Sequence, residues 1–169
     1  MPGEIEIIPA GEKPLIAVCA ALAGRIWPEY FTPMLDTAII NRVLLTYQSE
    51  AGISSQIKAG ARYFLVRIKS EDIGYLSLEP RIDEKKLFLS KFYLLADKRG
   101  RGIGRKMMTF VETFAKNNGL KKIELAVYSG NRSAVGIYKR FGFSIIGTFR
   151  RDFGDGLQAV DYIMEKILS

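Results

Sequence analysis

The alternation and helical spacing of hydrophobic residues divide the first part of the chain into one strand and three helices. Residues 4–8 alternate polar and apolar positions, which predicts a short strand. Residues 14–27 are rich in Ala and Leu and precede Pro28, which predicts a helix that ends at this proline. Apolar residues at helical spacing predict a second helix over residues 33–47, and residues 54–60 are typical of a short capped helix that ends at a glycine.

Strand patterns dominate the second part of the chain. Residues 63–68 and 73–79 flank the polar turn 69–72, which predicts a hairpin, and a longer apolar strand covers residues 87–95. A glycine-rich segment then leads into a helix with an apolar face that ends near residues 117–119. The remaining elements are predicted as a strand at 122–128, a helix at 132–140 and strands at 143–150 and 158–167. This order predicts a mixed α/β fold, with an antiparallel front half followed by one β-α-β unit.

Length and composition limit the kind of protein. The 169 residues fit a single domain, residues 1–169. Hydrophobic residues make up 48% and charged residues 25%, which is ordinary for a globular protein that buries a full core without disulfides. The sequence contains no His and one Cys, Cys19, which excludes Ser-His-Asp and Cys-His nucleophile systems and zinc sites built from these residues. We therefore expect no metal, and chemistry based on carboxylates, Tyr, Ser, Lys, water or backbone amides.

The charge balance points to a phosphate-bearing partner. Lys and Arg number 25 against 18 for Asp and Glu, which gives a net charge of +7. Such an excess suits a nucleotide, a cofactor or a nucleic acid. Five basic residues fall within nine positions, namely Lys98, Arg99, Arg101, Arg105 and Lys106. The longest uncharged run, residues 14–24, is too short to span a bilayer and has no charged leader, so we expect a cytoplasmic protein that does not bind membranes.

The glycine-rich segment is the clearest candidate for ligand binding. Three alternate glycines, Gly100, Gly102 and Gly104, allow a ligand to approach the backbone at a helix start, where N–H groups are unpaired. The alternative is a plain turn with glycines for steric reasons and arginines for solubility. Walker A and Rossmann motifs do not fit, because both require glycine at the position of Arg105.

The remaining pattern, Arg99-x-x-Gly102-x-Gly104, resembles the pyrophosphate loop of the GNAT superfamily of acyl-CoA-dependent N-acetyltransferases. A second motif of this family follows at the expected spacing, carried by Asn131, Ala134, Tyr138 and Phe141-Gly142-Phe143. The resemblance extends from about Ile73 to the C-terminus. It implies the GNAT fold, a mixed and mostly antiparallel central sheet of six to seven strands flanked by about four helices.

The resemblance also implies a binding mode for acetyl-CoA, the acetyl donor. Acetyl-CoA would lie in a V-shaped gap between the strands at 87–95 and 122–128. The backbone of Phe92, Tyr93 and Leu94 would pair with the pantetheine arm as an added strand does. The pyrophosphate would be held by the segment made of Arg99, Gly100, Arg101, Gly102, Ile103, Gly104 and Arg105. Asn131 would contact the pantetheine or the CoA tail, and it is equally suited to cap the following helix.

The family implies the catalytic roles as well. An amine attacks the thioester, and the N–H of Leu94, near an expected bulge in its strand, would stabilise the oxyanion. Tyr138 would act as the acid that assists the leaving thiolate, although a tyrosine at this spacing also suits core packing. Positions that carry a glutamate base in many relatives read Ser90 and Ala126. The general base is left open among Glu79, Glu124, Asp161 and water.

The acceptor side is predicted from residues before position 60. Trp27, Tyr30 and Phe31 lie near two acids, Glu29 and Asp36, and this combination suits a cationic amine. The alternative is helix-packing aromatics with solvated acids.

The ending of the chain, residues 155–166, is loosely similar to bacterial polyamine N-acetyltransferases. We expect a small-molecule or peptide amine as acceptor and leave a homodimer open. A non-catalytic acyl-CoA-binding regulatory module is the alternative function. Nucleic-acid binding is not expected, because the basic cluster lies on the predicted cofactor loop.

Overall fold

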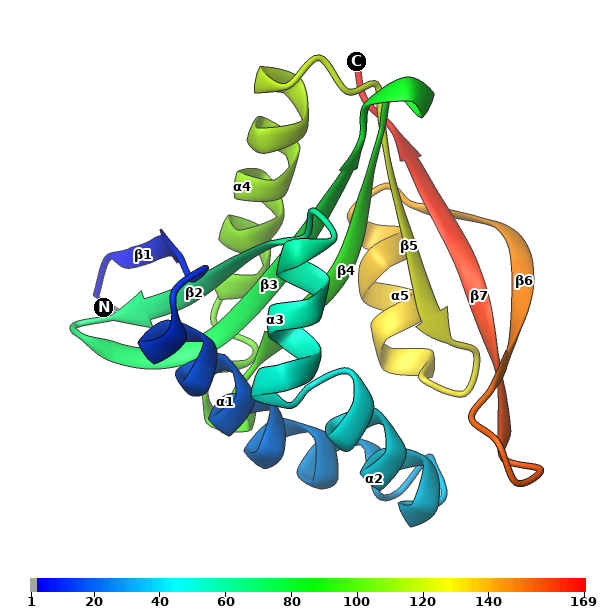
Figure 1. Ribbon diagram of the computed structural model, residues 1–169. Coiled ribbons are helices and arrows are strands. Elements are labelled where there is room, and N and C mark those ends of the chain that lie inside the picture. Colours follow the sequence, from blue (N-terminus) through cyan, green and yellow to red (C-terminus); the bar gives the residue numbers. More distant parts are fainter. Residues whose placement is uncertain (1–2) are drawn as a thin grey trace.

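The structure, a computed structural model, describes residues 3–169, which form one seven-stranded sheet with helices on both faces (Figure 1). The strands are β1 (Ile5–Pro9), β2 (Arg62–Ile68), β3 (Glu71–Arg81), β4 (Lys86–Leu94), β5 (Lys122–Tyr128), β6 (Ser144–Asp152) and β7 (Gln158–Ile167). The helices are α1 (Lys13–Phe31), α2 (Thr37–Thr46), α3 (Glu50–Lys58), α4 (Ile103–Asn117) and α5 (Arg132–Arg140). The strand order is β1-β2-β3-β4-β5-β7-β6, and every neighbouring pair is antiparallel except β4 and β5. The expected GNAT-type α/β architecture is confirmed, with one helix more than the four expected.

Two hydrophobic clusters hold the helices to the two faces of the sheet. The α1–α3 helices pack against one face through residues such as Trp27, Ile53 and Tyr75. The α4 and α5 helices cover the other face, where Met107 and Val135 meet Leu76. Tyr75 and Leu76 are adjacent in β3 and both fully buried, because successive side chains of a strand point to opposite faces. The centre of the sheet is therefore covered by helices on both faces, which holds β3 and β4 in place between them.

Most predicted elements occur in the structure, and the helix boundaries before residue 60 differ. The prediction that α1 ends at Pro28 is wrong, because the helix continues to Phe31. Proline removes one backbone hydrogen bond there, and burial of Trp27 and Phe31 in the cluster offsets this loss. The second helix begins later than predicted, after Asp36, whose side chain accepts a hydrogen bond from Ala38 N at 2.8 Å.

The one parallel pair of strands within residues 3–169, β4 and β5, opens into a gap. Lys86–Phe88 pairs with Lys122–Glu124, and β4 and β5 have no further pairing beyond these positions. Past Phe88, β4 stays paired with β3, and β5 stays paired with β7 along its whole length. The two strands therefore diverge toward their carboxyl ends, and the predicted V-shaped gap is present.

A β-bulge lies on the β4 side of the gap. Ser77 is opposite Lys91, and Leu78 is opposite Leu89, so Ser90 is the extra residue. The expectation of a bulge near Leu94 is wrong by four positions. The bulge turns the strand at the point where the gap begins to widen.

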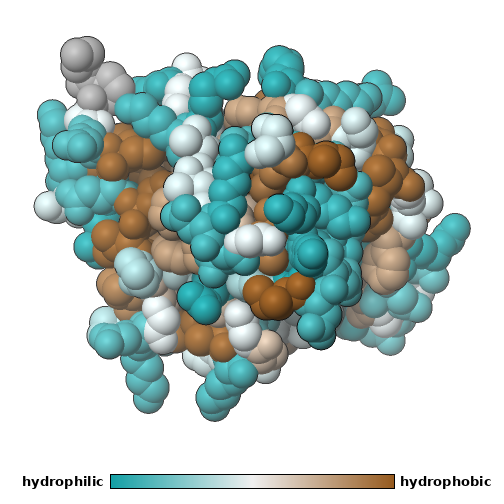
Figure 2. All heavy atoms as spheres, turned by 90° about the horizontal axis from the view of Figure 1, so that it is seen from above, coloured by the Kyte–Doolittle hydropathy of each residue, from teal (hydrophilic) through white to brown (hydrophobic). Residues whose placement is uncertain are grey.

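The surface shows no continuous apolar face in the view of Figure 2, where hydrophobic side chains form separate patches among hydrophilic ones. Within residues 3–169, no helix has the length and apolar character needed to cross a membrane. In the same residues, His, Cys, Asp and Glu side chains do not gather in groups of three or more that could hold a metal ion.

Candidate active site

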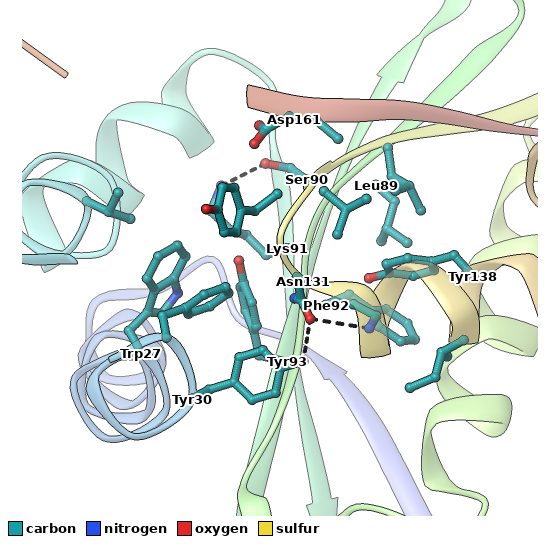
Figure 3. A pocket seen from close by; sticks show the side chains of 18 of the residues that line it. Trp27, Tyr30, Leu89, Ser90, Lys91, Phe92, Tyr93, Asn131, Tyr138 and Asp161 are labelled. Carbon is teal, nitrogen blue, oxygen red and sulfur yellow. Dashed lines mark hydrogen bonds between the residues drawn. The ribbon is translucent and has the colours of Figure 1, made fainter. Parts of the chain in front are cut away.

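A cavity of about 700 Å³ occupies the gap between β4 and β5. Its walls come from the last turns of α1, from α2, the end of β3, β4, β5, parts of β6 and β7, the first turn of α4 and the inner face of α5. Figure 3 shows Trp27 and Tyr30 of α1 on one side of this space, and Asn131 and Tyr138 on the other. The cavity therefore joins the predicted cofactor gap and the predicted acceptor side.

The inner edge of β4 offers free backbone groups to the cavity. Leu95 N donates to Ile73 O at 2.9 Å. In the alternating antiparallel pattern, Tyr93 likewise pairs with β3, whereas Phe92 and Leu94 turn their N–H and C=O groups toward the gap. Phe92 and Leu94 thus have the orientation that an added strand of pantetheine needs, and Tyr93 contributes its side chain instead.

The glycine segment presents unpaired amides at the start of α4. Gly100 and Gly102 have φ of 74° and 79°, a backbone conformation that favours glycine, and Gly102 is the N-cap. The first intrahelical bond runs from Lys106 N to Gly102 O, so the N–H groups before it have no helical partner. Gly104 differs, because its φ is ordinary and a Cβ there would meet nothing within 4 Å. The protein itself gives no reason for glycine at this position, and a ligand that contacts the backbone would give one.

Arg99 lies at the mouth of the cavity and turns back toward β4. Its Nε and its NH2 group donate to Leu94 O at 3.2 and 2.8 Å. Its guanidinium lies over the Tyr30 ring, 4.7 Å from the ring centre. Arg99 therefore connects the cofactor loop, β4 and α1, and it covers the Leu94 carbonyl while leaving the Leu94 N–H to the cavity.

Asn131 is almost fully buried and serves as the N-cap of α5. Its Oδ1 accepts from Ala134 N at 3.3 Å and from the Tyr30 hydroxyl at 2.7 Å. The capping alternative considered for this residue is therefore present in the structure. The Tyr30 bond also ties α1 to α5 across the cavity (Figure 3).

Tyr138 lines the cavity from α5 and packs between two rings. Its ring centre lies 6.2 Å from that of Phe92 and 5.8 Å from that of Phe143. Burial raises the pKa of Tyr138 well above its ordinary value, so its hydroxyl keeps its proton throughout the neutral range. Tyr138 is thus a hydrogen-bond donor in an apolar wall.

The three candidate bases differ in position. Asp161 lines the cavity and is 3% exposed, and its Oδ2 lies 3.6 Å from Arg151 NH1. Burial raises the pKa of Asp161, and Arg151 opposes this effect. Glu124 also lines the cavity, but its Oε2 is held by Lys86 Nζ at 2.9 Å. Glu79 lies outside the cavity wall.

The aromatic part of the predicted acceptor cluster is in the cavity, and the acidic part is not. Trp27 stacks on Phe31 with ring centres 4.1 Å apart, and its edge meets Tyr93 at 5.9 Å. Glu29 and Asp36 are exposed and lie outside the cavity wall. Glu29 and Asp36 are therefore solvated acids, which was the alternative to a role in binding a cationic amine.

Sequence reasoning does not identify two basic residues of the acceptor side. Lys91 of β4 and Arg151 of β6 both line the cavity. Lys91 lies in an apolar strand next to the bulge residue. In the sequence, the one hint that it faces the cavity is a lone lysine between Ser90 and Phe92. Arg151 stands beside Arg150 on a strand at the sheet edge, and nothing in the sequence separates the two.

Comparison with known proteins agrees with this geometry. Residues 25–143 match the acetyltransferase (GNAT) family model, so this chain belongs to that family. It is 27% identical over 118 residues to "Probable N-acetyltransferase 14" of Xenopus tropicalis, covering 68% of this chain and 57% of that protein. It is 31% identical over 75 residues to "Probable spermine N(1)-acetyltransferase" of Bacillus subtilis subsp. natto, covering 41% of this chain and 49% of that protein.

The fold is shared with solved structures over nearly the whole chain. The PaiA N-acetyltransferase of Thermoplasma acidophilum, solved in complex with coenzyme A, superimposes with a TM-score of 0.79 at 20% identity, covering 98% of this chain and 99% of that one. The chain spans about half the length of the curated relatives it matches.

Proposed function

We propose that this protein transfers an acetyl group from acetyl-CoA to a primary amine of a small molecule or a peptide, by direct attack while both substrates are bound. One observation carries the proposal: the gap between β4 and β5 brings free backbone groups of β4, unpaired amides of α4 and an acid on β7 into one cavity.

The residues of the gap suit acetyl-CoA. The free N–H and C=O groups of Phe92 would pair with the pantetheine arm as an added strand does, because Arg99 already covers the Leu94 carbonyl. Amides of Gly102, Ile103 and Gly104 would bind the pyrophosphate, because unpaired N–H groups and the helix dipole both favour an anion at a helix start. The open space above Gly104 supports this fit, since a phosphate oxygen could reach the backbone there without displacing a side chain.

Leu94 and Tyr138 stabilise charge as the thioester reacts. The Leu94 N–H, which faces the gap, would donate to the oxyanion that forms on the carbonyl oxygen. A free thiol has a pKa of about 8.5, well below that of the buried Tyr138 hydroxyl. Full proton transfer from Tyr138 to the leaving sulfur is therefore uphill, and a hydrogen bond to the sulfur is its main contribution.

Asp161 is the base that we propose. Its raised pKa makes it a stronger base than an ordinary aspartate, and it lies in the cavity wall at the open end of the gap, opposite Tyr128. It would accept the proton of the attacking ammonium directly or through one water. Glu124 is less suited, because its pairing with Lys86 favours the ionised form and occupies one oxygen.

Initial-rate kinetics test this function. Acetyl-CoA and an amine are varied together, and thiol release and the acetylated amine are both measured, using spermidine, aminoglycosides, amino acids and short peptides. Intersecting double-reciprocal plots are expected for direct attack in a ternary complex. Acetyl-CoA binding by calorimetry with no thiol release for any amine would instead support the non-catalytic acyl-CoA-binding module. Parallel plots would contradict direct attack.

A further inference from the structure

The acceptor side of the cavity holds a lysine, Lys91, for which the described residues provide no ion pair. Lys91 Nζ donates to Ser90 Oγ at 2.8 Å. Within residues 3–169, no carboxylate lies within ion-pair distance of Lys91. The two acids of the cavity wall have other partners, since Asp161 pairs with Arg151 and Glu124 with Lys86.

The charged groups of this wall affect one another. Burial lowers the pKa of Lys91 to about 8, with Glu79 opposing the effect and Arg151 adding to it. Burial raises the pKa of Tyr93, with Arg151 lowering it and Asp161 raising it. Lys91, Arg151, Asp161 and Tyr93 therefore share one electrostatic environment in the cavity wall. Two cations, Lys91 and Arg151, and one anion, Asp161, line this part of the wall, whereas Glu79 acts on Lys91 from outside it. A second anion inside the cavity is therefore expected from the ligand.

We propose that the acceptor is a small amino-carboxylate, and that Lys91 Nζ binds its carboxylate while Arg151 adds positive charge. This inference rests on the proposed acetyl transfer and names its substrate class. The carboxylate would supply the counter-ion that Lys91 lacks in the cavity. Asp161 would face the amine end of the same molecule, so the site would present opposite charges to the two ends of a zwitterion. A polyamine has no group for Lys91 and Arg151, and like charges would repel it.

A binding experiment tests the anion site without turnover. N-acetyl amino acids and their neutral amides, such as N-acetyltyrosine and N-acetyltyrosinamide, are titrated into the CoA-loaded protein by calorimetry. We expect the carboxylates to bind at least tenfold more tightly than the amides. Lys91→Met should reduce this preference to less than threefold, while Lys139→Met, at an exposed position of α5, should leave it unchanged. Equal or tighter binding of the amides would overturn the proposal.

A turnover experiment addresses the substrate class and separates the two proposals. kcat/KM is compared within two pairs of amines that differ by a carboxylate, tyrosine with tyramine and lysine with cadaverine. Spermidine is included as a polycationic amine without a carboxylate. We expect each carboxylate-bearing amine to be favoured at least tenfold, and Lys91→Glu to reverse the order. Preference for spermidine by the unmodified protein would overturn the inference and leave acetyl transfer standing. Thiol release for no amine would overturn acetyl transfer, and the calorimetric comparison would still decide the anion site.

Discussion

Replacement of Gly104 by Ala separates the stability of the cofactor loop from its binding function. Gly104 has an ordinary φ in the first turn of α4, and the new Cβ would meet nothing within 4 Å. Alanine in a helix is more stable than glycine by roughly 0.5–1 kcal/mol. For a chain of this size, 1 kcal/mol shifts the melting temperature by about 2–4 °C. We therefore expect Gly104→Ala to melt at a slightly higher temperature.

The same change is expected to weaken the binding of acetyl-CoA. A Cβ on Gly104 would stand where the pyrophosphate approaches the backbone, and a hydrogen bond to a charged group contributes about 1.5–3 kcal/mol. Loss of one such bond corresponds to roughly 10- to 100-fold weaker binding. Differential scanning calorimetry of the free protein and titration calorimetry with acetyl-CoA measure the two effects separately.

Gly136→Ala is the matched control for this prediction. Gly136 lies inside α5, and a Cβ there would meet only Arg140 NH1, at 3.9 Å. It should gain similar stability with unchanged affinity. Gly102 is less informative, because its φ of 79° makes any side chain strained at about 1–2 kcal/mol. If Gly104→Ala raised the melting temperature and bound acetyl-CoA as tightly as before, the proposed pyrophosphate site would be refuted.

Three further predictions concern the cavity wall. Tyr138→Phe should lower kcat at least tenfold and leave acetyl-CoA affinity nearly unchanged, and a large loss of affinity with an unchanged kcat would contradict its role at the leaving sulfur. Asp161→Asn should lower kcat by about 100-fold or more. Because Asp161 acts as a base only when it is ionised, kcat of the unmodified protein should rise with pH through the raised pKa of Asp161. The variant should lack this rise. Binding of N-acetyltyrosine should weaken as the pH rises through about 8, because Lys91 of the free protein loses its proton there; its charged neighbours are Glu79 and Arg151. Lys91→Arg should remove this pH dependence.

Much of the fold follows from local patterns in the sequence. The bounds of β5, α5 and β7 match the predictions, because each element is delimited by caps and turn residues. The predicted β2–β3 hairpin is present, and its turn is shorter than the predicted 69–72 because β3 begins at Glu71; Lys69 and Ser70 form this turn at positive φ. The end of α1 was not predictable from Pro28, because the burial that carries the helix to Phe31 depends on tertiary contacts.

The cofactor side of the site was more predictable than the acceptor side. The loop around Gly102 and the cap at Asn131 are contiguous motifs whose local geometry determines their roles. The acceptor wall brings together Trp27 of α1, Lys91 of β4 and Arg151 of β6, which are far apart in the sequence. Which charges face the cavity depends on the bulge at Ser90 and on the strand order, and neither can be read from composition.

The most direct test of the central claim measures acetyl-CoA consumption and product mass in one reaction with an amino-carboxylate such as tyrosine. The account predicts that thiol release depends on the amine and that one acetylated amine forms for each thiol released. Thiol release at the same rate without an amine would contradict acetyl transfer as the function of this cavity. Acetyl-CoA binding with no thiol release for tyrosine or for any other amine tested would contradict it as well.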